Sequence, residues 1–246
     1  AIDLGTIDQQ VVANQQINNT LYQLTAQQSG SFTVEAMFEN ANGNIDLIAR
    51  DMDGNLLASS MGTENLERLD ITVESGTVFT VEVVGVNQAV TLRLTNLVQQ
   101  TSNGFIVSGT SNSDDIYVDL GQRTIVINDA SYSASSANAF ASVIINAGAG
   151  IDNITLTGSD AAETASLSTN QVTVTSAGFS LTATAFTNVT INSSSTDVAH
   201  LFDTSGDEQF TATPTSAQLT GDSFQFTVNG FGPVPPHAST ATAQAP

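Results

Sequence analysis

The sequence predicts an all-β protein: an antiparallel, jelly-roll-like β-sandwich followed by a repetitive β-solenoid (β-helix). Two observations lead to this fold class. Thr, Val and Ile alternate with small polar residues through most of the 246 residues, which is the pattern of strands in sheets. The second half of the chain also repeats itself at a fixed offset, and periods of about 20–50 residues are typical of solenoids and related arrays.

The composition narrows the choice of partners. The chain has 4 Lys and Arg residues against 24 acidic ones, for a formal net charge of -20 at pH 7. Such a surface repels nucleic acid, because phosphate binding relies on Lys and Arg. No run of about 18 apolar residues occurs, so no membrane span is expected. The chain begins with Ala rather than Met, as processed products do, and we expect a secreted or cell-surface protein.

Residues 1–100 are predicted to form the sandwich together with a polar, Gln- and Asn-rich N-terminal segment. The strand candidates are separated by Gly, Asn, Asp and Ser, as antiparallel strands are by their turns. In "TVFTVEVV", Phe79, Val81 and Val83 share one apolar face. One apolar face per strand predicts a half-buried strand of a sandwich.

The order "GSFTVEAMF", "NIDLIARDMDGNLLASS", "ENLERLDITVESGTVFTVEVVG" and "VTLRLTNL" covers roughly residues 20–97. This region resembles the pre-peptidase C-terminal (PPC) domain of secreted bacterial proteins. The resemblance implies an antiparallel β-sandwich attached to exported enzymes and surface proteins. It implies no particular activity, because the domain accompanies many activities.

Residues 101–231 are predicted to form the solenoid. Residues 152–186 align without a gap on residues 197–231, at an offset of 45. The seven identical positions are Asp152/Asp197, Leu156/Leu201, Glu163/Glu208, Thr175/Thr220, Phe179/Phe224, Thr182/Thr227 and Phe186/Phe231. Each unit holds several short strands, which we expect to make about two coils of a β-helix. An immunoglobulin-like sandwich built from similar hairpins is the alternative fold.

The stretch "HLFDTSGDEQFTATPTSAQLTG" followed by "FQFTVNGF" is similar to the acidic repeats of very large planctomycete-type surface proteins. The resemblance implies an extracellular, structural setting. It rests on residues 197–231, because the first copy has "TGSDAAETA" where the second has "FDTSGDEQF". Residues 232–246 form a Pro- and Ala-rich tail.

Two acidic turns are candidate calcium sites. Asp51, Asp53 and Asn55 in "DMDGN" alternate oxygen ligands around a Gly turn, as calcium loops do. Asp203 and Asp207 bracket "TSG", a turn able to fold carboxylates and carbonyls around one cation. The alternative in both places is a turn without metal. Ca²⁺ is the one cofactor predicted.

A third acidic stretch, "SNSDD", contains Asp114 and Asp115. Adjacent residues of a strand point to opposite faces, so these two carboxylates cannot easily share an ion. We expect a solvated turn there.

Catalysis is not expected. His200 and His237 stand apart in the sequence, no Cys is present, and no Ser lies in a G-x-S-x-G motif. We therefore predict that the chain is not an enzyme.

These observations favour a structural subunit of an extracellular or cell-surface filament, sheath or matrix that self-associates into a homopolymer, with calcium as a candidate stabiliser. Either terminus could add as a strand to a neighbour's sheet edge. One alternative is a non-catalytic module that binds carbohydrate or protein for an exported enzyme, although the chain has no Trp and only 3 Tyr to stack on sugars. A less favoured alternative is a β-helix enzyme that degrades polysaccharides.

Overall fold

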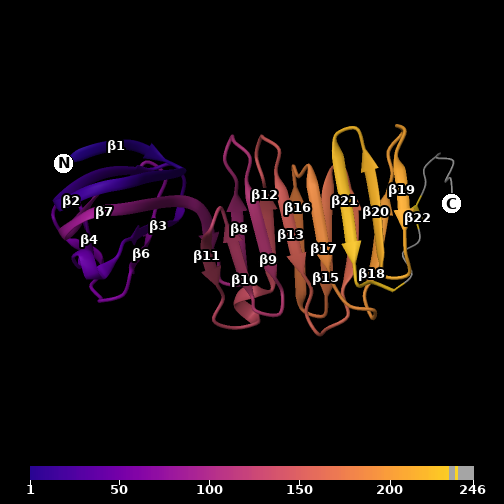
Figure 1. The fold of residues 1–246 in the computed structure, drawn as a ribbon. Helices are drawn as coiled ribbons and strands as arrows, with labels where there is room; N and C mark the ends of the chain where they lie inside the picture. Colours follow the sequence, from indigo (N-terminus) through magenta and orange to yellow (C-terminus); the bar gives the residue numbers. More distant parts are fainter. Residues whose placement is uncertain (233–235, 238–246) are drawn as a thin grey trace. The chain divides into compact units, whose positions relative to one another are not determined.

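The structure is a computed structural model that describes residues 1–232 and 236–237. The chain divides into two compact units, Ala1–Gln100 and Thr101–Pro246, and both are built from β-strands (Figure 1). The helical turns of the described residues are two short 3-10 turns, η1 (Asn40–Asn42) and η2 (Asn138–Phe140). The predicted fold class, a sandwich followed by a solenoid, is confirmed. None of the described helices is long and apolar enough to cross a membrane.

The first unit is organised by two long antiparallel strands, β2 and β7, that take part in two sheets. The first half of β7 pairs with β4, which pairs with β5, and its second half pairs with β3, which pairs with β6. Strand β1 adds to the end of β2 in parallel. The strands are β1 (Ile2–Ile7), β2 (Gln9–Ala26), β3 (Gly30–Met37), β4 (Ile45–Asp51), β5 (Leu56–Ser60), β6 (Leu66–Val73) and β7 (Val78–Gln100).

The polar N-terminal segment is itself part of the sandwich, since it forms β1 and most of β2. The pairing of β2 with β7 shifts register between Val12 and Gln15 and again between Asn18 and Thr20. Asn14 and Asn19 lie at these irregularities with φ of 53° and 50°. Asn tolerates this left-handed conformation better than most residues do, so the Asn-rich composition allows the strand to bend between the sheets.

The core of the sandwich follows the predicted alternation. Phe79, Val81 and Val83 are all buried, which confirms the apolar face of β7. Phe79 meets Phe32 of β3 edge to face, with ring centroids 5.0 Å apart and an interplanar angle of 83°. This geometry is one of the favoured arrangements of aromatic pairs.

The second unit is a β-solenoid whose chain passes back and forth between two sheets. We define sheet A by the order β8-β12-β16-β15-β14-β18-β22 and sheet B by the order β11-β10-β9-β13-β17-β21-β20-β19. The strands of sheet A are β8 (Gly104–Ser108), β12 (Ser142–Asn146), β14 (Thr164–Ser168), β15 (Gln171–Ser176), β16 (Phe179–Thr184), β18 (Val198–Phe202) and β22 (Pro236–His237). Those of sheet B are β9 (Asp115–Asp119), β10 (Thr124–Ile127), β11 (Ala130–Ser133), β13 (Asn153–Thr157), β17 (Asn188–Asn192), β19 (Gln209–Ala212), β20 (Ser216–Gly221) and β21 (Phe224–Asn229).

Parallel, in-register pairing distinguishes this unit from an immunoglobulin-like sandwich. Strands β8, β12 and β16 stack in parallel in sheet A, and β9, β13, β17 and β21 do so in sheet B. Antiparallel strands enter as meanders: β9 to β11, β14 to β16 and β19 to β21. The alternative fold for this half is therefore wrong.

The sequence repeat corresponds to a structural unit that changes sheet. The first copy places β14, β15 and β16 in sheet A, whereas the second places the aligned β19, β20 and β21 in sheet B. From β13 the chain crosses to β14, from β16 to β17, and from β17 to β18. Because the number of crossings is odd, the next copy begins in the opposite sheet. A unit thus makes one and a half coils rather than the expected two.

The solenoid core is filled by alternate residues of these strands, including Ile154, Leu156 and Ile191. The Phe140 ring stacks on Phe179 with centroids 5.6 Å apart. Beyond the solenoid, Pro236–His237 of the predicted tail form β22, which pairs in parallel with β18. Residues 233–235 and 238–246 of the tail lie outside the described residues.

Candidate functional site

Asp51, Asp53 and Asn55 form the turn between β4 and β5. Asp51 Oδ1 accepts hydrogen bonds from the backbone N–H of Asp53 (3.0 Å) and of Asn55 (2.8 Å), and Oδ2 accepts one from Asn55 Nδ2 (2.8 Å). The bond from the Asn55 side chain is the largest influence that lowers the pKa of the Asp51 carboxyl. Both carboxylate oxygens therefore close the hairpin turn, and a cation would compete with these donors.

Asp203 and Asp207 lie in the loop that joins β18 to β19. In the same loop the Thr204 hydroxyl donates to Glu208, and the Gly206 N–H donates to Thr204 Oγ1 at 3.1 Å. Glu208 Oε2 is buried and has no hydrogen-bond partner. Across residues 1–232 and 236–237, no group of three or more His, Asp or Glu side chains is close enough to hold a metal. Calcium at Asp203 and Asp207 stays a prediction.

A recurring feature of the solenoid is an acidic residue that directly precedes a strand and accepts a hydrogen bond from Ser or Thr four positions earlier. We call these segments acid turns. The acidic side chain is partly or fully buried. Its carboxylate accepts hydrogen bonds from donors of the turn that would otherwise have no partner when folding shields them from water. The four acid turns pair Thr110 with Asp114, Ser159 with Glu163, Ser193 with Asp197, and Thr204 with Glu208.

Two pairs of acidic residues also join successive coils. The backbone N–H of Asp114 donates to Asp152 Oδ1, and that of Glu163 donates to Asp197 Oδ1, both at 2.8 Å. All four residues are at most 3% exposed. The first pair precedes strands of sheet B and the second precedes strands of sheet A, so such links between coils occur in both sheets.

Asp152 and Asp197, the two acceptors of these links, differ in the direction in which their carboxyl pKa is shifted. Burial would raise the pKa of Asp197, but hydrogen bonds from Glu163, Ser193 and Ser194 outweigh it and hold the pKa below its usual value. Burial raises the pKa of Asp152, whose position four residues earlier is Gly148 rather than Ser or Thr. Asp152 Oδ2 has no hydrogen-bond partner. Asp152 thus lacks the donors that stabilise the charged form of Asp197.

The expectation of a solvated turn at Asp114 is wrong. Asp114 is fully buried, and it accepts bonds from the Thr110 N–H at 2.7 Å and from Asn128 Nδ2 at 2.5 Å. These two donors come from its own turn and from the β10–β11 hairpin, and they offset the loss of hydration. Asp115 is exposed and accepts a bond from Asn153 Nδ2 at 2.6 Å on the outer face of sheet B.

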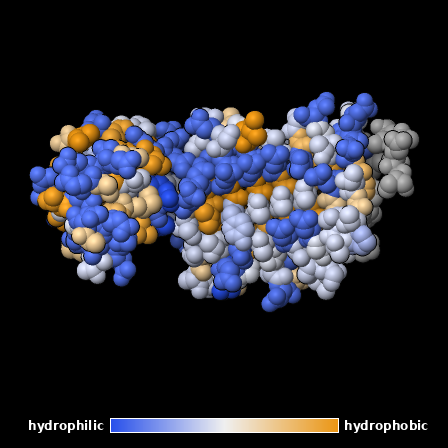
Figure 2. All heavy atoms as spheres, in the orientation of Figure 1, coloured by the Kyte–Doolittle hydropathy of each residue, from blue (hydrophilic) through white to orange (hydrophobic). Residues whose placement is uncertain are grey.

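Polar rows cross the outer face of sheet B, because its parallel strands are in register. Asn188 Nδ2 donates to Asn153 Oδ1 at 2.8 Å, and Asn229 Nδ2 donates to Asn192 Oδ1 at 2.9 Å. A hydrophilic band runs across the solenoid in the space-filling view (Figure 2). Such amide ladders stabilise stacked, identical strands.

The sandwich carries one buried charge cluster. Glu35 of β3 is 5% exposed and forms salt bridges with Arg68 of β6 at 3.1 Å and with Arg93 of β7 at 3.0 Å. The three residues are paired across neighbouring strands. Two of the four Arg residues of the chain thus neutralise a buried carboxylate of the sandwich.

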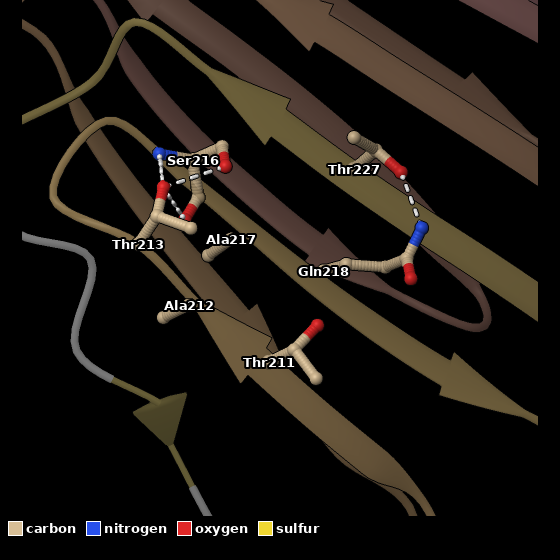
Figure 3. A pocket seen from close by; sticks show the side chains of 7 residues that line it. All are labelled: Thr211, Ala212, Thr213, Ser216, Ala217, Gln218 and Thr227. Carbon is tan, nitrogen blue, oxygen red and sulfur yellow. Dashed lines mark hydrogen bonds between the residues drawn. The ribbon is translucent and has the colours of Figure 1, made fainter. Parts of the chain in front are cut away.

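An open surface pocket of about 260 Å³ lies at the end of sheet B, beside β19 (Figure 3). Gln218 Nε2 donates to Thr227 Oγ1 at 3.3 Å, and Thr213 Oγ1 accepts the Ser216 N–H at 3.1 Å. Its walls carry hydroxyl, amide and methyl groups and no charge. The lining residues are Thr211, Ala212, Thr213, Ser216, Ala217, Gln218 and Thr227.

His200 lies on β18, beside Ser166 of β14, and its ring centroid is 6.4 Å from that of Phe202. His237 belongs to β22. The predicted absence of enzymatic activity stays a prediction.

The acid turns carry a sequence signal that could have been found. Each has Ser or Thr, three residues, and then Asp or Glu before an alternating segment: "TSNSD", "SDAAE", "SSSTD" and "TSGDE". The links between coils have no local signal, since their partners are 38 and 34 residues apart.

Together, the two units define an all-β protein that combines a sandwich with a parallel β-solenoid. No family model and no curated protein matches the chain. One solved structure, the pre-peptidase C-terminal domain of a collagenase from Bacillus anthracis, is 11% identical with a TM-score of 0.29. The match covers 38% of this chain and 91% of that domain, and it does not assign the chain to that family.

Proposed function

We propose that the chain is a non-catalytic structural subunit of an extracellular or cell-surface assembly, and that it self-associates. The observation that carries the proposal is the end of sheet B. Among the described residues, β19 pairs with β20 alone, and its sequence, "QFTA", has no charge and no Pro. Monomeric proteins usually protect such edges with charge, Pro or a bulge.

The use of the acidic side chains supports a structural role. In the second unit, Asp114, Glu163 and Asp197 lie inside turns and bond to neighbouring coils. These contacts make the coils depend on each other, as in solenoids whose stability comes from neighbouring repeats. The polar rows on sheet B add further contacts between coils.

The high negative charge is compatible with assembly, because strand β19 itself carries none of it. A formal charge of -20 opposes random aggregation, and an uncharged edge leaves one place where two chains can approach. Calcium would reduce the remaining repulsion near Asp203 and Asp207.

Sedimentation velocity over a wide range of chain concentration, with and without Ca²⁺, tests the proposal. We expect species larger than a monomer that increase with concentration. A single monomeric species under all of these conditions contradicts it.

A further inference from the structure

The edge of β19 offers backbone hydrogen-bonding groups. The Thr213 N–H donates to the Ser216 carbonyl at 2.8 Å and closes the β19–β20 hairpin. In an antiparallel pair, residues alternate between those that bond to the partner and those that point away. Thr211 and Gln209 therefore bond to β20, while the N–H and C=O groups of Phe210 and Ala212 point toward the open edge.

The two ends of β19 differ in charge. Asp207 and Glu208 precede the strand, and Asp222 follows β20 at the same end, since Thr220 pairs with Gln209. The opposite end leads into the turn "TPTS" (213–216), which has no charged residue. A partner strand with one acidic end is therefore repelled when that end lies beside the start of β19. It is not repelled when that end lies beside the neutral turn.

Resting on the proposed self-association, we propose that the partner at this edge is β19 of a second copy, paired in antiparallel orientation. Antiparallel pairing about a twofold axis places the acidic end of each strand beside the neutral turn of the other. It gives a closed, isologous dimer in which sheet B is continuous across two chains.

The other edge strand of sheet B, β11, fits less well. Strands β11 and β19 run in the same direction in the sheet, so head-to-tail stacking would pair them in parallel. The start of β11 follows Asn128 and Asp129, and parallel pairing would bring Asp129 toward Glu208. Like charges at neighbouring strand ends disfavour this arrangement.

The side chains of β19 suit the antiparallel junction. Phe210 pairs with Leu219 and Ala212 with Ala217, and both partners in β20 are buried in the core. Phe210 is only partly buried, and Ala212 is exposed. A second β19 would cover both and extend the core across the junction.

The test compares Ala212→Pro with Ser131→Pro, a matched change on β11. Asn128 and Asp129 form the β10–β11 turn, so the Ser131 N–H also points away from its hairpin partner. Pro removes one outward N–H in each variant and leaves the bonds within the hairpin intact. Because the dimer has this bond twice, we expect the dissociation constant of Ala212→Pro to rise at least about tenfold. We expect that of Ser131→Pro to be unchanged.

Native mass spectrometry or sedimentation gives the outcomes. If Ala212→Pro associates as tightly as the wild type, the β19 junction is wrong while the proposed function stands. If both variants dissociate, the junction is head-to-tail between β19 and β11, and the antiparallel dimer is wrong. If only Ser131→Pro dissociates, the junction lies at β11 without β19, and the antiparallel dimer is again wrong. A monomeric wild type overturns the proposed function as well.

Hydrogen exchange of the wild type keeps the inference testable if Ala212→Pro does not fold. The amides of Phe210 and Ala212 should gain protection as the chain concentration rises, whereas those of Ser131 and Ser133 should not. Concentration-independent exchange at Phe210 and Ala212 contradicts the junction.

Discussion

The backbone N–H of Glu163 donates a 2.8 Å hydrogen bond to Oδ1 of Asp197, a residue of the next coil. Asp197 is 2% exposed, and its other oxygen accepts bonds from Ser193 and from both the N–H and the hydroxyl of Ser194. One carboxylate therefore closes its own turn and fixes the coil before it. This dual use explains why a solenoid with few positive charges can bury acids.

Asp197→Ala should destabilise the second unit by about 2–4 kcal/mol, because it leaves the buried Glu163 N–H and the half-buried Ser194 N–H without an acceptor. Urea unfolding followed by circular dichroism measures the change. Asp160→Ala, at an exposed acid of a neighbouring turn, is the control and should change the free energy of unfolding by less than about 0.5 kcal/mol. Equal effects of the two substitutions would count against the role of Asp197.

Asp152→Asn should stabilise the protein at pH 7 by about 1 kcal/mol, because the amide keeps an oxygen for the Asp114 N–H and removes a buried charge. Thermal unfolding of both proteins measures the difference. A loss of stability at pH 7 would show that the charge of Asp152 is compensated.

The pH dependence of the free energy of unfolding should distinguish Asp152 from Asp197, the two acceptors of the links between coils. The folded-state pKa of Asp152 is raised, so its ionisation costs stability as pH rises through that pKa, and the cost is absent below the unfolded value of 3.8. The folded-state pKa of Asp197 is lowered, so its contribution is present above 3.8 and is lost as pH falls through the folded value. The advantage of Asp152→Asn should thus vanish near pH 3, where the cost of Asp197→Ala should also shrink. A pH-independent difference for either variant contradicts these assignments.

Glu35→Ala should destabilise the first unit by about 2 kcal/mol, because Arg68 and Arg93 lose their shared partner. Removing one partner of a fully buried salt bridge costs about 3–5 kcal/mol. We expect a smaller loss here, because the Arg68 and Arg93 side chains are 25% and 16% exposed. Chemical unfolding with Glu82→Ala as control, a half-buried acid of β7, measures the cost. If both variants unfold at the same urea concentration, Glu35 does not stabilise the sandwich through Arg68 and Arg93.

The calcium prediction for Asp203 and Asp207 can be tested by thermal unfolding with Ca²⁺ or with chelator. Ca²⁺ should raise the midpoint of the wild type and of Asp53→Asn, but not that of a variant with Asp203→Asn and Asp207→Asn, because binding to the folded state alone stabilises it. No shift in the wild type would remove the calcium site.

The sequence predicted those parts of the fold that depend on local periodicity. The alternation around Phe79 identified a buried face, and the identity of positions such as Asp152 and Asp197 identified a repeat. Both signals are local or self-similar, so they can be read along one chain.

Other features depend on partners distant in sequence and were missed. Asp114 looked like part of a solvated turn, but Asn128, 14 residues further along the chain, donates to its carboxylate and helps to offset its burial. The repeat unit gave no indication that successive copies change sheet, because that depends on the number of crossings and not on any residue. The strand character of β2 was masked by its Gln and Asn residues, whose neighbours on β7 supply the pairing.

Electron microscopy of the purified chain shows directly whether this structural subunit self-associates. We expect particles that contain two chains joined at the β19 ends of their solenoids, in a proportion that increases with concentration. Particles that contain a single chain at every concentration would rule out self-association.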